Sequence, residues 1–193
     1  MEILITLLVI VAIIAIFLII TYNTLVKMRE NVSEAFKAIS VALEERLRTV
    51  GGVIDAAKKY MDFESDVLQK VVEARSGLQN ALKSADTREA AQANDRLQNA
   101  FQGLNVQLEA YPDLKASQLM ANAQDSFTQT AQKIASHQNY FNGTVREYNK
   151  KIKVFPTVLF ASMFGFSEET YYESDQATQS KVNDADMARD LNF

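Results

Sequence analysis

The sequence contains no cysteine, one histidine, 6 glycines and 2 prolines in 193 residues. Without cysteine the chain can form no disulfide, no thioether link to haem and no thiolate metal site. The single histidine, His137, has no second histidine or cysteine with which to build a catalytic triad or a histidine-rich metal site. Because it lies between Ile134 and Phe141 at helical spacing, we expect a partly buried structural histidine.

Sequence motifs for catalysis or ligand binding are missing as well. There is no Walker loop, no glycine-rich dinucleotide fingerprint and no G-x-S-x-G. The acidic residues Asp184, Asp186 and Asp190 lack the loop glycine and terminal glutamate of an EF-hand, and we interpret Glu64 with Asp66 as surface charge too. The net charge is −4 and the basic residues are scattered, which argues against nucleic-acid binding. We predict no enzyme activity, no catalytic residue, no metal and no cofactor.

Scarce glycine and proline also argue against a strand-rich fold, in which turn signals recur about every 8 to 12 residues. The expected fold class is therefore all-α.

A long apolar run is present at the N-terminus. Within residues 3–20 the only polar side chain is Thr6. Such a run spans roughly 27 Å as a helix, enough for one membrane crossing. Glu2 precedes the run and no small-residue cleavage site follows it, so we expect an uncleaved transmembrane anchor over residues 1–22.

The flanks of this run suggest an orientation. Tyr22 falls where an interfacial aromatic ring is expected, and Lys27, Arg29 and Lys37 all lie on the C-terminal side. We therefore expect a single-pass protein with most of the chain in the cytoplasm.

Residues 23–166 show helical periodicity, which predicts an antiparallel bundle of about four long helices. The first continues the anchor and is expected to end at Gly51-Gly52, because paired glycines are poor helix formers. The second follows, with Asp62 as a candidate joint. We expect each helix to be about 25 to 40 residues long.

Capping signals mark the later helices. Asp86 followed by Glu89 is a capping-box variant that predicts the third start, Pro112 marks the end of that helix, and Ser117 can start the fourth. The fourth runs to Pro156 and contains Gly143, which we expect to be a close-packing glycine. Residues 167–193 are polar and acidic and are expected to form a mobile tail.

An even number of antiparallel helices returns the chain to the membrane. The apolar stretch VFPTVLFASMFGF, residues 154–166, would then arrive at the headgroups. Three roles are open for it: closing the bundle core, docking on the membrane, or contacting a second copy. The candidate contact residues are Tyr22, Val158, Leu159, Phe160, Met163, Phe164 and Phe166.

The same end of the bundle holds two Tyr-Asn pairs, Tyr22-Asn23 and Tyr148-Asn149. We hypothesise that Asn23, Tyr148 and Asn149 form a hydrogen-bonded polar layer that sets helix register.

Several stretches together resemble the LemA family of bacterial membrane proteins. They are YNTLVKMRENVSEAFKAISVAL, then AYPDLKA, then FNGTVREYNKKIKVFP followed by GF and YYE, and they cover about Tyr22 to Glu173. The resemblance implies one N-terminal span and a helical bundle in the bacterial cell membrane, with suggested membrane-organising roles and no active site to transfer. The chain differs from the family pattern at Phe36, at Ser40, at Val50-Gly51-Gly52-Val53 and at Phe63-Glu64.

Together these features favour a non-enzymatic scaffold that contacts the lipid bilayer and forms a homo-oligomer. The alternative is an adaptor that captures a partner protein through the acidic tail ending in Leu191 and Phe193.

Overall fold

The computed structural model describes residues 1–59 and 66–173, and within these residues all regular structure is helical. The elements are α1 (Glu2–Ala57), α2 (Asp66–Ser84), α3 (Thr87–Gln107), the 3-10 turn η1 (Leu108–Ala110), α4 (Pro112–Lys115), α5 (Gln118–Lys153) and α6 (Val158–Ala161). The predicted all-α architecture, with an N-terminal apolar helix that continues into a bundle, is confirmed. The candidate joint at Asp62 and residues 174–193 lie outside the described residues.

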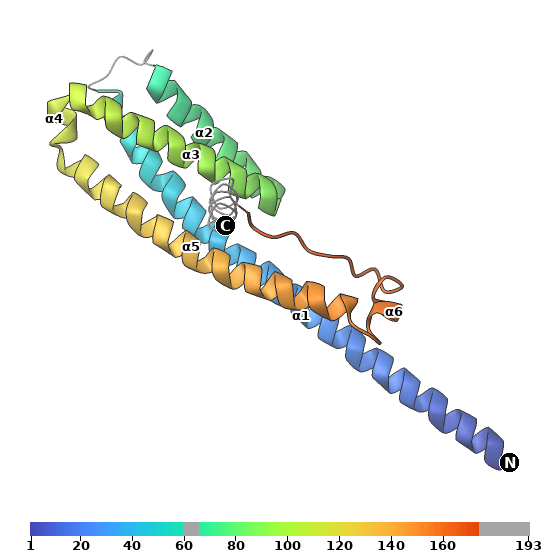
Figure 1. The fold of residues 1–193 in the computed structure, drawn as a ribbon. Coiled ribbons are helices and arrows are strands. Elements are labelled where there is room, and N and C mark those ends of the chain that lie inside the picture. The colour runs from blue at the N-terminus through green and yellow to red at the C-terminus, as the bar shows by residue number, and fades with distance from the viewer. Residues whose placement is uncertain (60–65, 174–193) are drawn as a thin grey trace, which may run out of the picture.

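Helix α1 is one uninterrupted helix of 56 residues. Its first part projects alone from the bundle, and its second part is the spine against which the other helices pack (Figure 1). Every side chain from Met1 to Ile20 is exposed except that of Leu18, which is half-buried. By length and composition, α1 is apolar enough to cross a membrane, and its exposed apolar side chains are compatible with a membrane anchor.

The expected break at Gly51-Gly52 is wrong, because α1 continues through both residues to Ala57. The flanking Val50, Val53 and Ile54 are buried in the core, and this packing outweighs a glycine cost of about 1 kcal/mol per residue. The absence of a side chain at Gly51 also leaves room for the side chain of Arg75. A Cβ there would lie 3.2 Å from the Arg75 guanidinium, whose Nε donates to the Leu47 carbonyl at 3.3 Å.

The four long helices alternate in direction (Figure 1). Helix α5 runs back along α1, while α2 and α3 form a hairpin that covers only the half of α1 farther from the N-terminus. Helices α2 and α3 contain 19 and 21 residues, so the expected length of about 25 to 40 residues is wrong for them. Two helices and an irregular segment, rather than four helices, therefore form the half nearer the N-terminus.

The predicted helix starts are confirmed. The Asp86 carboxylate accepts hydrogen bonds from the backbone N–H groups of Arg88 and Glu89, and the Ser117 hydroxyl accepts one from Met120. Pro112 occupies the first turn of α4. Gly143 lies inside α5 as predicted, but the close-packing role is wrong, since a Cβ there would meet no atom within 4 Å.

After α6 the chain turns back and runs beside α1 and α5 toward the α2–α3 hairpin (Figure 1). We call residues 167–173 of this segment the strap. The expected boundary of a mobile tail at residue 167 is placed too early, because Tyr172 is only 1% exposed and is part of the core.

Candidate membrane interface and buried polar centre

The stretch between α5 and the strap, residues 154–166, is called the apolar loop from here on. Three aromatic contacts join it to α1. The Tyr22 ring lies edge-on to Phe164 and to Phe166, with centroids 5.5 Å and 5.6 Å away, and Phe17 lies 6.5 Å from Phe160. The return of the chain to the level of Tyr22, predicted from helix counting, is therefore observed.

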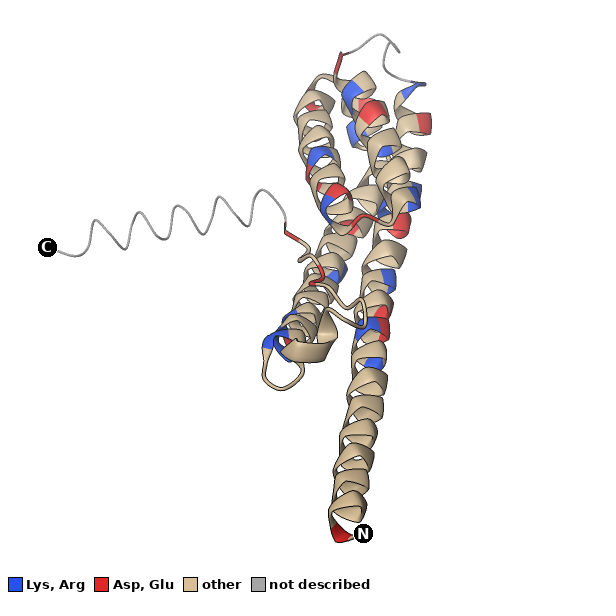
Figure 2. Cartoon of the chain, turned by 90° about the vertical axis from the view of Figure 1, so that its right-hand side faces the viewer, with Lys and Arg blue, Asp and Glu red and all other residues tan. Residues whose placement is uncertain are grey.

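The candidate contact residues divide into two groups. Phe166 is buried and Phe164 is half-buried under Tyr22, so these two rings close the end of the core. Val158, Leu159 and Met163 are exposed and do not belong to that core. The chain carries no charge from Val154 to Phe166, and Figure 2 shows this loop beside the uncharged part of α1.

The strap is held on α5 by two asparagines. Asn149 Nδ2 donates to the Glu169 carbonyl at 2.8 Å, and its Oδ1 accepts the Glu169 N–H at 2.9 Å. Asn142 forms the same pair with Tyr172, at 3.0 Å and 2.9 Å. The two asparagines are seven residues apart on a helix, about 10.5 Å, and the two strap residues are three apart, which spans about 10 Å when extended.

This pairing replaces the polar layer that the sequence suggested. Asn149 is buried, but its side-chain amide uses both its nitrogen and its oxygen to bond to the Glu169 backbone. The carboxylate of Glu169 in turn lies 3.2 Å from Arg29, which places Asn149 at the level of Arg29. Asn23 is exposed and lies six residues, roughly 9 Å, closer to the N-terminus, so the structure does not bring it to Asn149.

Where α1, α3, α5 and the strap meet, the core contains a buried arginine. Arg46 is 1% exposed, its Nη1 donates to Asn94 Oδ1 at 2.6 Å and its Nε donates to Thr130 Oγ1 at 3.5 Å. Its guanidinium also lies 4.3 Å from the centre of the Phe127 ring, a cation–π contact, and Phe127 stacks on Phe101 at 4.0 Å. One side chain thereby links three helices.

The comparison with known proteins follows this architecture. The model of the LemA family matches residues 35–184. This chain belongs to the LemA family. It is also similar to Protein LemA of Metamycoplasma hominis, with 23% identity over 165 residues that cover 86% of this chain and 74% of the relative.

Burial shifts the pKa of Arg46 and of Tyr172 in this LemA-family chain. Loss of solvent lowers the pKa of Arg46 to about 10, an effect that Tyr172 and Asp95 partly offset. Burial raises the pKa of the Tyr172 hydroxyl well above its ordinary value; Asp95 raises it further and Arg46 opposes the rise. Both groups remain in their ordinary protonation states at neutral pH. The Tyr172 hydroxyl and Arg46 Nη2 have no hydrogen-bond partner among the described residues.

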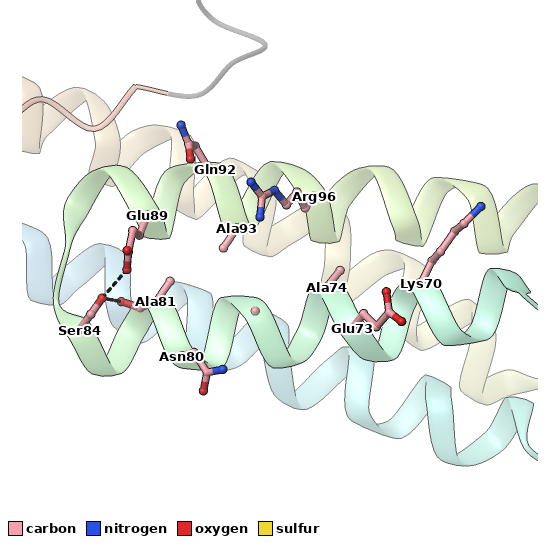
Figure 3. A pocket seen from close by; sticks show the side chains of 11 residues that line it. Lys70, Glu73, Ala74, Asn80, Ala81, Ser84, Glu89, Gln92, Ala93 and Arg96 are labelled. Atoms are coloured by element: carbon pink, nitrogen blue, oxygen red, sulfur yellow. Dashed lines mark hydrogen bonds between the residues drawn. The ribbon is translucent and has the colours of Figure 1, made fainter.

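A groove with a volume of about 770 Å³ lies between α2 and α3 (Figure 3). Alanines and Gly77 contribute to its floor, and Lys70, Glu73, Glu89 and Arg96 add two charges of each sign. The Ser84 hydroxyl donates to Glu89 at 2.8 Å. No set of three metal-ligating side chains occurs in residues 1–59 and 66–173, and His137, in the middle of α5, is half-buried.

The roles of Arg46, Asn142 and the strap were not predicted from the sequence. Arg46 lies between Leu43 and Val50 in a stripe of core positions, and a charged residue at such a position is a sign of a buried polar contact. Asn142 shares its face of α5 with Asn149, a candidate residue of the predicted polar layer.

Proposed function

We propose that this chain is a non-enzymatic, membrane-anchored scaffold that self-associates at the cytoplasmic face of the membrane. The observation that carries the proposal is the continuity of α1, in which the apolar exposed part and the bundle spine are one helix. A rigid connection of this kind fixes the height and direction of the bundle relative to the bilayer. Because each copy is held by its own α1, all copies would present the same surfaces at the same height above the bilayer.

The groove between α2 and α3 is the surface that best suits contact with a second copy. Small side chains allow another helix to approach closely (Figure 3). Its rim has equal numbers of positive and negative charges, so identical rims can pair with each other. Confinement to one membrane also raises the effective concentration of copies.

A pair of glycine variants tests this proposal. Gly77 in the groove and Gly103 outside it are both exposed and helical, and a Cβ at either would meet no atom within 4 Å. Gly77→Gln should therefore fill the groove without disturbing the bundle, and Gly103→Gln is its matched control. We expect full-length protein in mild detergent to form a defined homo-oligomer by light scattering, which Gly77→Gln weakens and Gly103→Gln leaves intact.

A monomeric wild-type protein at every concentration would contradict the scaffold. If Gly77→Gln and Gly103→Gln form oligomers of the same size and stability, the groove does not form the contact between copies. A monomer that retains one partner protein only when residues 174–193 are present would instead support the adaptor function.

A further inference from the structure

The apolar loop has an outer face that the bundle does not cover. The exposed fractions are 77% for Phe155, 60% for Leu159 and 66% for Met163, and Val154 and Val158 are also exposed. The inner face is fixed, because Phe164 and Phe166 pack against Tyr22. The loop is therefore held in place by its inner side chains, while Phe155, Leu159 and Met163 are directed away from the protein.

The depth of this face follows from the α1 contacts. Phe160 lies against Phe17, which belongs to the exposed apolar part of α1 and is five residues closer to the N-terminus than Tyr22. Five helical residues correspond to about 7.5 Å. Interfacial elements of membrane proteins typically bury their apolar face about 5–10 Å below the headgroups. If Tyr22 marks the interface, Phe160 lies at that depth.

Charged side chains lie at the two ends of the apolar loop. The last turn of α5 carries Lys150, Lys151 and Lys153, immediately before the uncharged loop. Lys153 forms an exposed ion pair with Glu168 at 2.7 Å, on the chain that leaves the loop. Three lysines thus lie at one end of the apolar residues, where they could contact lipid phosphates.

We propose that the apolar loop is a second membrane attachment, which inserts Phe155, Leu159 and Met163 into the leaflet that α1 leaves. The partner is the lipid surface, with acyl chains around the loop tip and headgroups at the lysines. The inference rests on the membrane anchorage of the proposed function. With a second attachment beside α1, the protein could not rotate freely about α1.

Labelling at single cysteines tests this, since the natural chain has none. Full-length Leu159→Cys, Ile13→Cys and Val106→Cys variants would carry an environment-sensitive fluorophore in vesicles of phosphatidylcholine and phosphatidylglycerol. The three positions are comparably exposed, at 60%, 61% and 75%. Ile13 is in the span, and Val106 is an exposed apolar residue on α3, far along the chain from the apolar loop.

We expect the label at position 159 to shift to the blue and to be quenched by lipids with a quencher on the acyl chain, as at position 13. The label at position 106 should show neither change. If position 13 is quenched and position 159 is not, the loop proposal fails while the anchor stands. A blue shift at position 159 without lipid quenching would mean a protein contact and would also overturn it. Quenching at neither position would refute the membrane anchor itself.

Discussion

Replacing Asn149 with alanine removes both hydrogen bonds that hold the Glu169 backbone on α5. Each such bond contributes about 1 kcal/mol net, so local release of the strap should become easier by about 2 kcal/mol. At 1.4 kcal/mol per factor of ten, this corresponds to roughly 30-fold faster amide exchange. The bundle itself should be little affected, because the helices keep their own packing.

Hydrogen exchange measured by NMR reports this directly, since the Glu169 N–H is itself the donor to Asn149. The amide of Leu43 in the core of α1 should be unchanged. Gln138→Ala is a matched control, because it removes a single hydrogen bond, from Gln138 Nε2 to the Tyr172 carbonyl. That carbonyl still accepts a hydrogen bond from Asn142 Nδ2. That variant should leave Glu169 exchange unchanged. If the amide exchange rate of Glu169 is unaltered in Asn149→Ala, or if amides across the core accelerate equally, the asparagines do not hold the strap on α5.

Four further variants test the bundle. Gly52→Ala and Gly143→Ala should each raise the free energy of unfolding by about 0.5–1 kcal/mol in urea titrations, because a Cβ meets no neighbour within 4 Å at either position. A lower free energy of unfolding in either variant would mean that the added methyl group meets a neighbour, which would contradict the prediction. Arg46→Met should lower the free energy of unfolding by about 3–5 kcal/mol, since it removes the donor to Asn94 and the cation near buried Asp95; a neutral effect in thermal melting would contradict the role of the polar centre. Tyr172→Phe should lessen the loss of stability above about pH 10, as checked by urea midpoints across alkaline pH. Because the pKa of the Tyr172 hydroxyl is higher in the folded than in the unfolded protein, its contribution to stability is complete below the unfolded-state pKa and is lost as the pH rises above it. If the urea midpoints of Tyr172→Phe fall with pH as those of the wild type do, Tyr172 does not cause the alkaline loss of stability.

The helical architecture could be predicted because periodicity and caps are local signals. Asp86 and Ser117 are N-caps as expected, since a short polar side chain next to an apolar stripe has a specific use at a helix start. The return of Phe160 to the level of Phe17 needed only the number of reversals. The break at Gly51-Gly52 was misjudged because propensity is weaker than the burial of Val50 and Val53.

The strap was not predictable in the same way. Its position depends on side-chain bonds from Asn142 and Asn149 to an irregular backbone segment, and such bonds leave no periodic pattern in that segment. The acidic residues around it suggested a tail, yet Tyr172 is buried beside Arg46. The exposure of Leu159 and the burial of Phe166, two apolar residues of one loop, also depend on tertiary packing.

If the chain leaves the membrane and returns to it, the apolar loop lies beside the end of the span. The most direct measurement is the distance between spin labels on cysteines introduced at exposed Asn23 and Leu159, in vesicles where labelled protein is diluted with unlabelled protein. We predict one short, narrow distance within the molecule. A long or broad distribution would contradict the account.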